Sequence, residues 1–111
     1  MTSTRNESVD RAKMLQEWRA WVERIARAAA RILPDVEVYA FRGKAGRETS
    51  AINVLIVSNN VPGCFLERAS LKARIEEAAG LPYNHPFRIH LMGRREAEFY
   101  KHNIQGIDKI L

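Results

Sequence analysis

The sequence predicts a single α+β domain over residues 1–111, a two-layer α/β arrangement with helices packed on one face of a small mixed β-sheet. Two observations lead to this prediction. Segments with helical spacing of apolar residues and segments typical of strands follow one another in the order α-β-β-α-β-α. A chain of 111 residues also has the size of one domain with its own core. Because helices precede and connect the strands, we expect them on one face, with the other face partly open.

The first segment, residues 8–33, predicts a long helix with one apolar face. Apolar side chains recur there at three- and four-residue steps, while Arg24, Arg27 and Arg31 lie largely off that stripe. The spacing from Thr4 to Glu7 is that of a capping box, Ser8 is another candidate cap, and Pro34 ends the helix. The polar residues 1–7 are expected to be disordered.

Two strands and a basic loop follow. Residues 36–41 alternate between apolar and more polar positions, as a strand does. Residues 52–57 form a nearly continuous β-branched run, which is typical of a strand buried on both faces. The connection, residues 42–50, carries three basic residues and two glycines. We expect it to form a loop.

The second half predicts a helix, a strand, a short helix and a tail. Residues 65–79 have a looser helical stripe, and Gly80 is a suitable residue to end that helix. Residues 86–92 alternate as a third strand, and residues 94–102 form a short helix. The apolar residues of the tail, 103–111, predict that it docks on the domain.

Composition excludes several classes of protein. The contents of 46% hydrophobic and 28% charged residues are ordinary for a globular protein, not for a disordered or collagenous chain. The longest aliphatic run, residues 54–57, is far too short to span a membrane, and the N-terminal residues lack the apolar stretch of a signal peptide. The single cysteine excludes an internal disulfide framework. We therefore expect a cytoplasmic protein without a membrane partner.

The charge balance is basic. The chain has 18 Lys and Arg residues against 13 Asp and Glu residues, so its net charge is +5. A basic domain attracts phosphates, nucleic acids or acidic proteins. A solvated surface with a modest imbalance is an equal alternative.

The sequence shows no metal-binding spacing and no nucleophile motif. Its three histidines lack the companions of a metal site, and His90 is most simply a partly exposed strand residue beside Arg88. The basic loop is a candidate phosphate site, because glycines let the backbone approach an anion that cations attract. Its residues are Arg42, Gly43, Lys44 and Arg47. A solvated turn is the commoner role of such a loop.

The stretch Ile32-Leu-Pro-Asp-Val-Glu-Val-Tyr-Ala-Phe-Arg-Gly-Lys-Ala-Gly-Arg-Glu-Thr-Ser-Ala-Ile-Asn-Val-Leu-Ile-Val57 places a basic glycine loop between two strands. It resembles the core of a minimal nucleotidyltransferase domain, the small archaeal and bacterial branch of the DNA polymerase β-like superfamily. Residues 81–91 and the Arg-Glu-Ala-Glu-Phe-Tyr helix after them resemble the family's third strand and last helix. The resemblance covers about residues 30 to 102 and implies that family's fold.

The resemblance also implies where a catalytic site would lie. Family members hold two divalent metals with three carboxylates, and those positions align here with Ala51, Asn53 and Arg88. The serine of the family's Gly-Ser motif is missing. Alanine cannot bind a metal ion and arginine repels one. We therefore expect no catalytic residue, metal or cofactor, and nucleotide binding by Arg42, Gly43, Lys44, Arg47, Asn53 and Arg88.

Three functions remain open at this point. The first is an inactive nucleotidyltransferase-like domain that binds a nucleotide, a phosphate group or a protein; family members often act beside a helical partner, in pairs resembling toxin–antitoxin modules. The second is an active Mg²⁺-dependent nucleotidyltransferase with an atypical site. The third is a basic nucleic-acid-binding module. The apolar tail also allows a homodimer.

Overall fold

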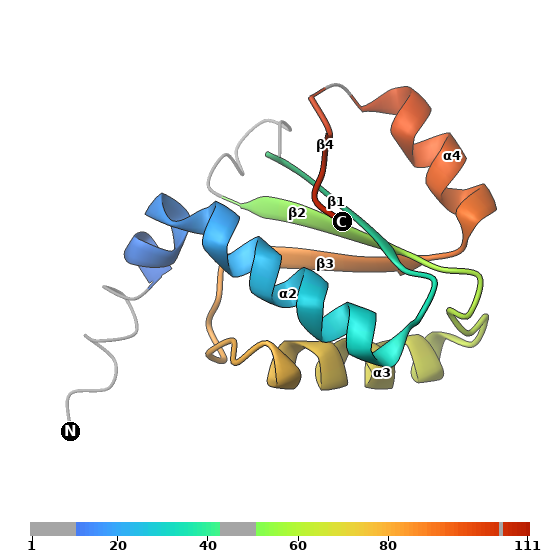
Figure 1. Cartoon of the computed structure of the whole chain (residues 1–111), viewed down its shortest axis with the longest axis horizontal. Helices are drawn as coiled ribbons and strands as arrows, with labels where there is room; N and C mark the ends of the chain where they lie inside the picture. Colours follow the sequence, from blue (N-terminus) through green and yellow to red (C-terminus); the bar gives the residue numbers. More distant parts are fainter. Residues whose placement is uncertain (1–10, 43–50, 105) are drawn as a thin grey trace.

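Four strands form one mixed sheet in the computed structural model, which describes residues 11–42, 51–104 and 106–111 (Figure 1). The strand order is β3-β2-β1-β4; β1 is antiparallel to β2 and β4, and β2 is parallel to β3. The elements are α2 (Trp18–Ile32), β1 (Glu37–Arg42), β2 (Ile52–Val57), α3 (Phe65–Ala78), β3 (Phe87–Met92), α4 (Arg94–Asn103) and β4 (Asp108–Lys109). The predicted α+β class, mixed sheet and order of elements are confirmed, with the short strand β4 added, whereas α4 lies on the opposite face from α2 and α3 and not on one face with them as predicted.

The first helix is interrupted at Glu17, where the sequence predicts a continuous helix. Residues 11–16 are helical, but Glu17 has φ −108° and ψ 34°, and α2 begins after it. The turn lets Met14 enter the core, at 3% exposure, and lets Arg11 donate to the backbone oxygen of His85 at 3.2 Å. Tertiary contacts thus override the local helical pattern. The predicted caps and residues 1–7 lie outside the described residues.

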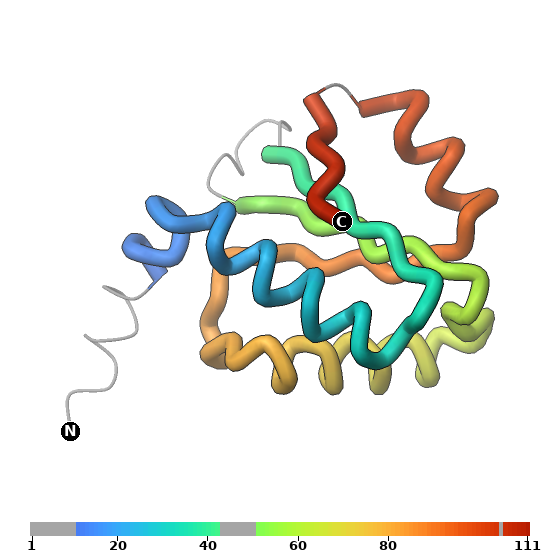
Figure 2. The backbone as a smooth tube through the Cα atoms, viewed as in Figure 1, coloured from blue at the N-terminus to red at the C-terminus, as the bar shows by residue number. Residues whose placement is uncertain are grey.

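The main core lies between the sheet and the two long helices. Figures 1 and 2 show α2 and α3 side by side across one face of the sheet. The α2 stripe predicted from the sequence is buried there against alternate residues of the three longer strands. The members of this main core include Val22, Ile25, Ala29, Val38, Val54, Ile56, Ile75 and Ile89.

A second, smaller core covers part of the opposite face. Ala97 of α4 packs there with Tyr39, Leu55 and Val57, and Tyr100 lies against the same cluster. This short helix therefore covers the end of the sheet where β2 and β3 finish. The beginning of β2 and β3 lies beyond it, on the face that the sequence predicts to be partly open.

The C-terminal tail docks on β1, as its apolar residues predict. Val38 donates its backbone N–H to the oxygen of Leu111 at 3.0 Å, and Ile110 donates to the oxygen of Val38 at 2.7 Å. β4 pairs with β1 through Tyr39–Lys109 and Ala40–Asp108. The tail thereby supplies hydrogen-bond partners to a strand that would otherwise form an open edge.

Gly80 ends α3, as the sequence predicts. Its φ of +74° is unfavourable for residues with a Cβ, and its N–H donates to the oxygen of Glu77 at 3.0 Å. The chain then turns toward β3. Among the described helices, of which α2 is the longest with 15 residues, none has the length and apolar character needed to cross a bilayer.

We predict that Ile75→Ala destabilises the domain by about 2–5 kcal/mol, because Ile75 is completely buried and its truncation leaves a cavity between α3 and the sheet. Leu66→Ala on the same helix is the matched control, since Leu66 is 73% exposed. Urea unfolding measures both variants. Equal stability of the two would contradict the observed packing of α3.

Candidate functional site

The positions aligned with the family's carboxylates meet where β2 and β3 begin. Ala51 directly precedes β2 and is buried, Asn53 is the second residue of β2, and Arg88 is the second residue of β3. The strand register pairs Asn53 with Arg88. Because side chains alternate along a strand, both belong to the sheet face opposite α2 and α3. An amide and a guanidinium therefore stand side by side at this point, with Arg88 exposed.

His90 completes this polar group. Its Nε2 lies 3.0 Å from Oδ1 of Asn53, and its ring centroid lies 5.9 Å from that of Tyr100 on α4. Burial lowers the pKa of His90, and the nearby charges of Lys72 and Arg88 lower it further. The imidazole is thus neutral at pH 7, and it donates its Nε2 hydrogen to the Asn53 oxygen.

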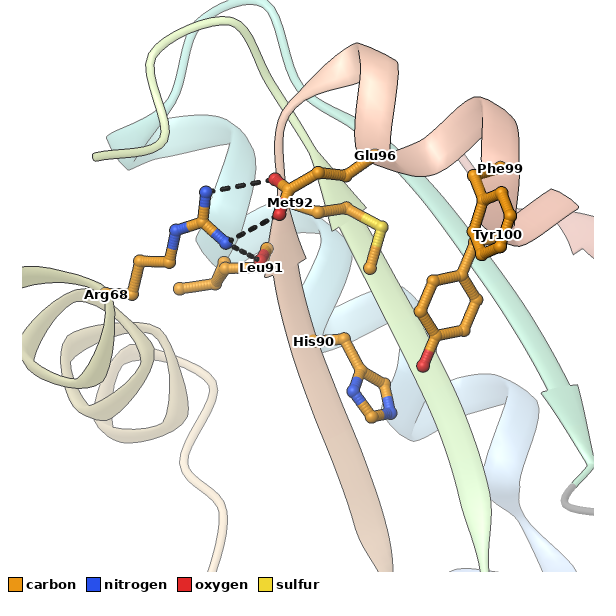
Figure 3. A pocket seen from close by; sticks show the side chains of 7 residues that line it. All are labelled: Arg68, His90, Leu91, Met92, Glu96, Phe99 and Tyr100. Carbon is orange, nitrogen blue, oxygen red and sulfur yellow. Dashed lines mark hydrogen bonds and ion pairs between the residues drawn. The ribbon is translucent and has the colours of Figure 1, made fainter. Parts of the chain in front are cut away.

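A cleft of about 610 Å³ extends from His90 along β3 toward α4 (Figure 3). Arg68 of α3 closes one end of it through an ion pair with Glu96 at 3.0 Å and a hydrogen bond to the oxygen of Leu91 at 3.2 Å. The bond from Arg68 lowers the pKa of the Glu96 carboxyl. The other end is aromatic, with Phe99 73% exposed. The lining residues are Arg68, His90, Leu91, Met92, Glu96, Phe99 and Tyr100.

The structure brings together only part of the predicted site. Arg42 is the last residue of β1, and alternation places it with Val38 and Ala40 on the face of α2 and α3. Arg42 and Arg88, which the sequence places in one predicted nucleotide-binding site, therefore lie on opposite faces of the sheet. The rest of the predicted loop site, Gly43, Lys44 and Arg47, lies outside the described residues.

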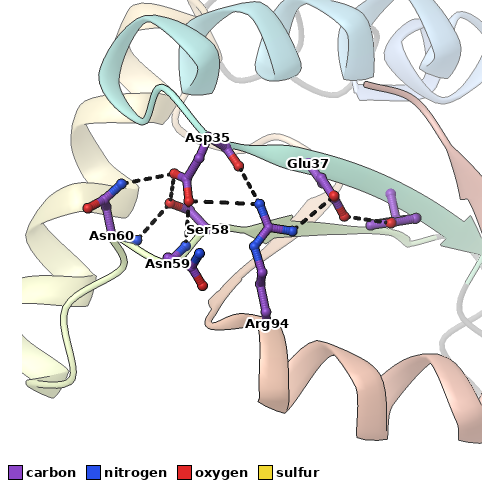
Figure 4. Close-up of polar contacts among 7 residues, drawn as sticks. Asp35, Glu37, Ser58, Asn59, Asn60 and Arg94 are labelled. Carbon is purple, nitrogen blue, oxygen red and sulfur yellow. Dashed lines mark hydrogen bonds and ion pairs between the residues drawn. The ribbon is translucent and has the colours of Figure 1, made fainter.

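Glu37, the carboxylate of β1 on the Asn53 face, is fully engaged by its neighbours (Figure 4). Arg94 donates to its Oε2 at 2.9 Å, and the hydroxyl of Tyr39 donates to its Oε1 at 2.8 Å. The bond from Tyr39, together with Arg94, lowers the pKa of Glu37. Glu37 therefore anchors α4 to β1 and does not offer a vacant metal ligand.

Asp35 is the centre of a second set of bonds at the same end of the sheet (Figure 4). It accepts hydrogen bonds from the hydroxyl of Ser58, from the N–H of Asn59 at 2.8 Å and from the amide of Asn60 at 3.0 Å. Arg94 also donates to its backbone oxygen at 3.0 Å. These bonds join the start of β1, the end of β2 and the start of α4.

The residues of this region do not fit a divalent metal. Within residues 11–42, 51–104 and 106–111, no group of three His, Cys, Asp or Glu side chains could hold a metal ion. The side chain of Ala51 offers no ligand atom, and Arg88 contributes a positive charge. Hard cations in proteins take several oxygen ligands, which include carboxylates. The donor set suits an anion instead.

Comparison with known proteins identifies the fold. No protein-family profile and no curated protein matches the sequence. A solved structure described as "Crystal structure of putative nucleotidyltransferase" matches 77% of this chain and 91% of its own chain, with a TM-score of 0.61 and 20% sequence identity. The chain thus has a nucleotidyltransferase-like fold, as its sequence resemblance predicts.

Sequence reasoning missed the bonds made by Asp35, Ser58, Arg68 and Arg94. Nothing in the sequence marks Ser58 as a bonding residue. The structure shows it completely buried, and a buried hydroxyl needs a polar partner. Asn53 does carry a signal in the sequence, because it interrupts a strongly apolar strand. The signal for His90 is its place on the same strand face as Arg88.

We predict that acid weakens the domain through Asp35. The hydroxyl bond from Ser58, followed by the N–H bond from Asn59, lowers the pKa of Asp35 from 3.8 to about 2. A carboxyl with a lowered folded-state pKa stabilises the fold above pH 3.8 and loses that contribution as the pH falls toward 2. Thermal unfolding between pH 2 and 5 should show this loss, and Asp35→Asn should flatten it.

The variant Ser58→Ala tests whether the Ser58 hydroxyl is the cause of the lowered Asp35 pKa. Removing the hydroxyl should move the Asp35 pKa, measured by carboxyl NMR titration, back toward its ordinary value. An unchanged pKa in this variant would contradict the assigned role of Ser58.

Proposed function

We propose that this chain is a non-catalytic nucleotidyltransferase-like domain that binds the phosphates of a nucleotide without a divalent metal. The observation that carries the proposal is the cross-strand pair of Asn53 and Arg88, which stands where the resembling family has metal-binding carboxylates. The shared fold supports the alignment of these positions. The single cysteine is consistent with a cytoplasmic location.

Arg88 supplies the charge that a metal ion supplies in the related enzymes. A guanidinium presents a fixed fork of N–H donors that matches two phosphate oxygens at once. Asn53 adds a neutral donor: its Oδ1 is occupied by His90, so its Nδ2 hydrogens are the part left for a ligand. His90 therefore orients the amide toward an acceptor.

The same residues oppose catalysis by metal ions. A guanidinium about 4 Å from a divalent cation repels it by about 8 kcal/mol at an effective dielectric constant of 20. Without carboxylates, nothing in the pair holds the metals that activate an attacking hydroxyl. Binding is thus retained while transfer is lost.

We predict that ATP raises the melting temperature in the presence of EDTA, and that Arg88→Glu abolishes this shift because it replaces attraction by repulsion. Arg95→Glu, the same charge change at an exposed position of α4, is the control and should retain the shift. Equal shifts in both variants would contradict the assigned site. Mg²⁺-dependent nucleotide transfer by the purified wild-type protein would overturn the non-catalytic proposal.

A second prediction restores the missing carboxylates. Ala51→Asp, Asn53→Asp and Arg88→Glu together should create a Mn²⁺ site measurable by electron paramagnetic resonance. The double variant that keeps Arg88 is the control, and it should bind Mn²⁺ at least tenfold more weakly, since about 1.4 kcal/mol of repulsion already has that effect. Failure of the folded triple variant to bind Mn²⁺ would contradict the alignment.

A further inference from the structure

A row of arginines follows the outer groove between α2 and α3. Arg24, Arg27 and Arg31 of α2 line a cleft of about 260 Å³ whose other walls are Ala28, Ala78 and Ala79. Arg74 of α3 lines the adjoining cleft beside the end of α2. We call these four residues, Arg24, Arg27, Arg31 and Arg74, the arginine seam. The seam lies on the helical layer, across the sheet from Asn53 and Arg88.

The spacing of the seam makes it one continuous surface. At 1.5 Å rise per residue, Arg27 lies about 4.5 Å and Arg31 about 10.5 Å along the helix axis from Arg24. The steps of three and four residues keep all three side chains on one side of α2. The remaining lining residues are alanines, so the only polar side chains among the described residues that line this cleft are the three arginines.

The seam arginines form no ion pair with a carboxylate among the described residues. Arg19, Arg68 and Arg94 each form an ion pair with a described carboxylate, whereas no member of the seam does so. Arg24 stacks on the ring of Trp21, with its guanidinium carbon 4.4 Å from the centroid. Glu67 lines the adjoining cleft together with Arg74, without an ion pair between the two side chains. Four such charges nearly equal the net charge of +5 of the whole chain.

A structural role explains two members of the seam, Arg24 and Arg31. α3 has no basic residue in its last turn, and the Arg24 guanidinium lies against Gly80, just beyond the end of that helix. A cation stabilises a helix C-terminus, but this effect is confined to the last turn. Arg31 stands in the last turn of α2 and has the same role for its own helix. The effect does not account for Arg27 and Arg74.

We infer that the arginine seam binds the phosphodiester backbone of a nucleic acid. Guanidinium groups bind phosphate oxygens in pairs, and a row of them can follow successive phosphates. A protein partner would need an apolar or aromatic centre to its interface, and the cleft that three of the arginines line offers only alanine. This surface is separate from the proposed nucleotide-phosphate site.

Salt dependence tests the inference with a fluorescent 20-nucleotide single-stranded RNA. Four phosphate contacts predict that log K falls with log salt concentration with a slope of about −2.8. Arg27→Ala with Arg31→Ala should reduce the slope to about −1.4 and weaken binding on the order of 25-fold at 0.1 M salt. Both residues are exposed and helix-compatible, so the variant should melt as the wild type does.

Arg95→Ala with Lys109→Ala is the matched control, since it removes two exposed positive charges away from the seam. It should retain the wild-type slope, and an equal loss in this control would overturn the inference in favour of net charge alone. No RNA binding at 0.05 M salt, or competition by polyglutamate as strong as by RNA, would also overturn it. The same titration with duplex DNA shows whether the seam prefers a single-stranded RNA backbone or a DNA duplex. The variant with Arg27→Ala and Arg31→Ala should still bind ATP as the wild type does. Loss of RNA binding in this variant would therefore not result from damage to the proposed nucleotide site.

Discussion

The burial of β2 on both faces is the constraint on which the rest of the structure depends. Apart from Asn53, the residues of this strand are inaccessible to solvent or nearly so. One face requires α2 and α3 as a cover, and the other requires α4. The single polar residue of the strand is consequently placed where α4 no longer reaches and His90 provides a hydrogen bond. The site exists because one position of the central strand is left outside both cores.

The fold was predictable where local pattern and tertiary packing agree. The apolar run of residues 52–57 coincides with β2, and Gly80 ends α3 as expected. The interruption at Glu17 was not predictable, because it depends on contacts with the loop before β3. β4 was missed for a related reason. Its two exposed residues have no strand pattern of their own and form a strand through backbone bonds with β1.

The candidate site was predictable in part. Alignment with the resembling family singled out Asn53 and Arg88, and the register of two parallel strands makes them neighbours. Arg42 was grouped with them because sequence position alone does not reveal the sheet face of a strand's last residue. The bonds of Arg94 to Asp35 and Glu37 join segments more than 50 residues apart, so no local sequence motif could predict them.

The bond from Arg68 to the oxygen of Leu91 has a consequence for the free edge of the sheet. β3 is an outer strand, and such a strand offers unpaired backbone groups to strands of other molecules. Arg68 occupies one of these groups near the end of β3, while Nδ1 of His85 accepts the N–H of Phe87 at its beginning. An incoming strand would therefore find one acceptor fewer near the end of β3 and one donor fewer at its beginning. Two side chains thereby limit the growth of the sheet into aggregates.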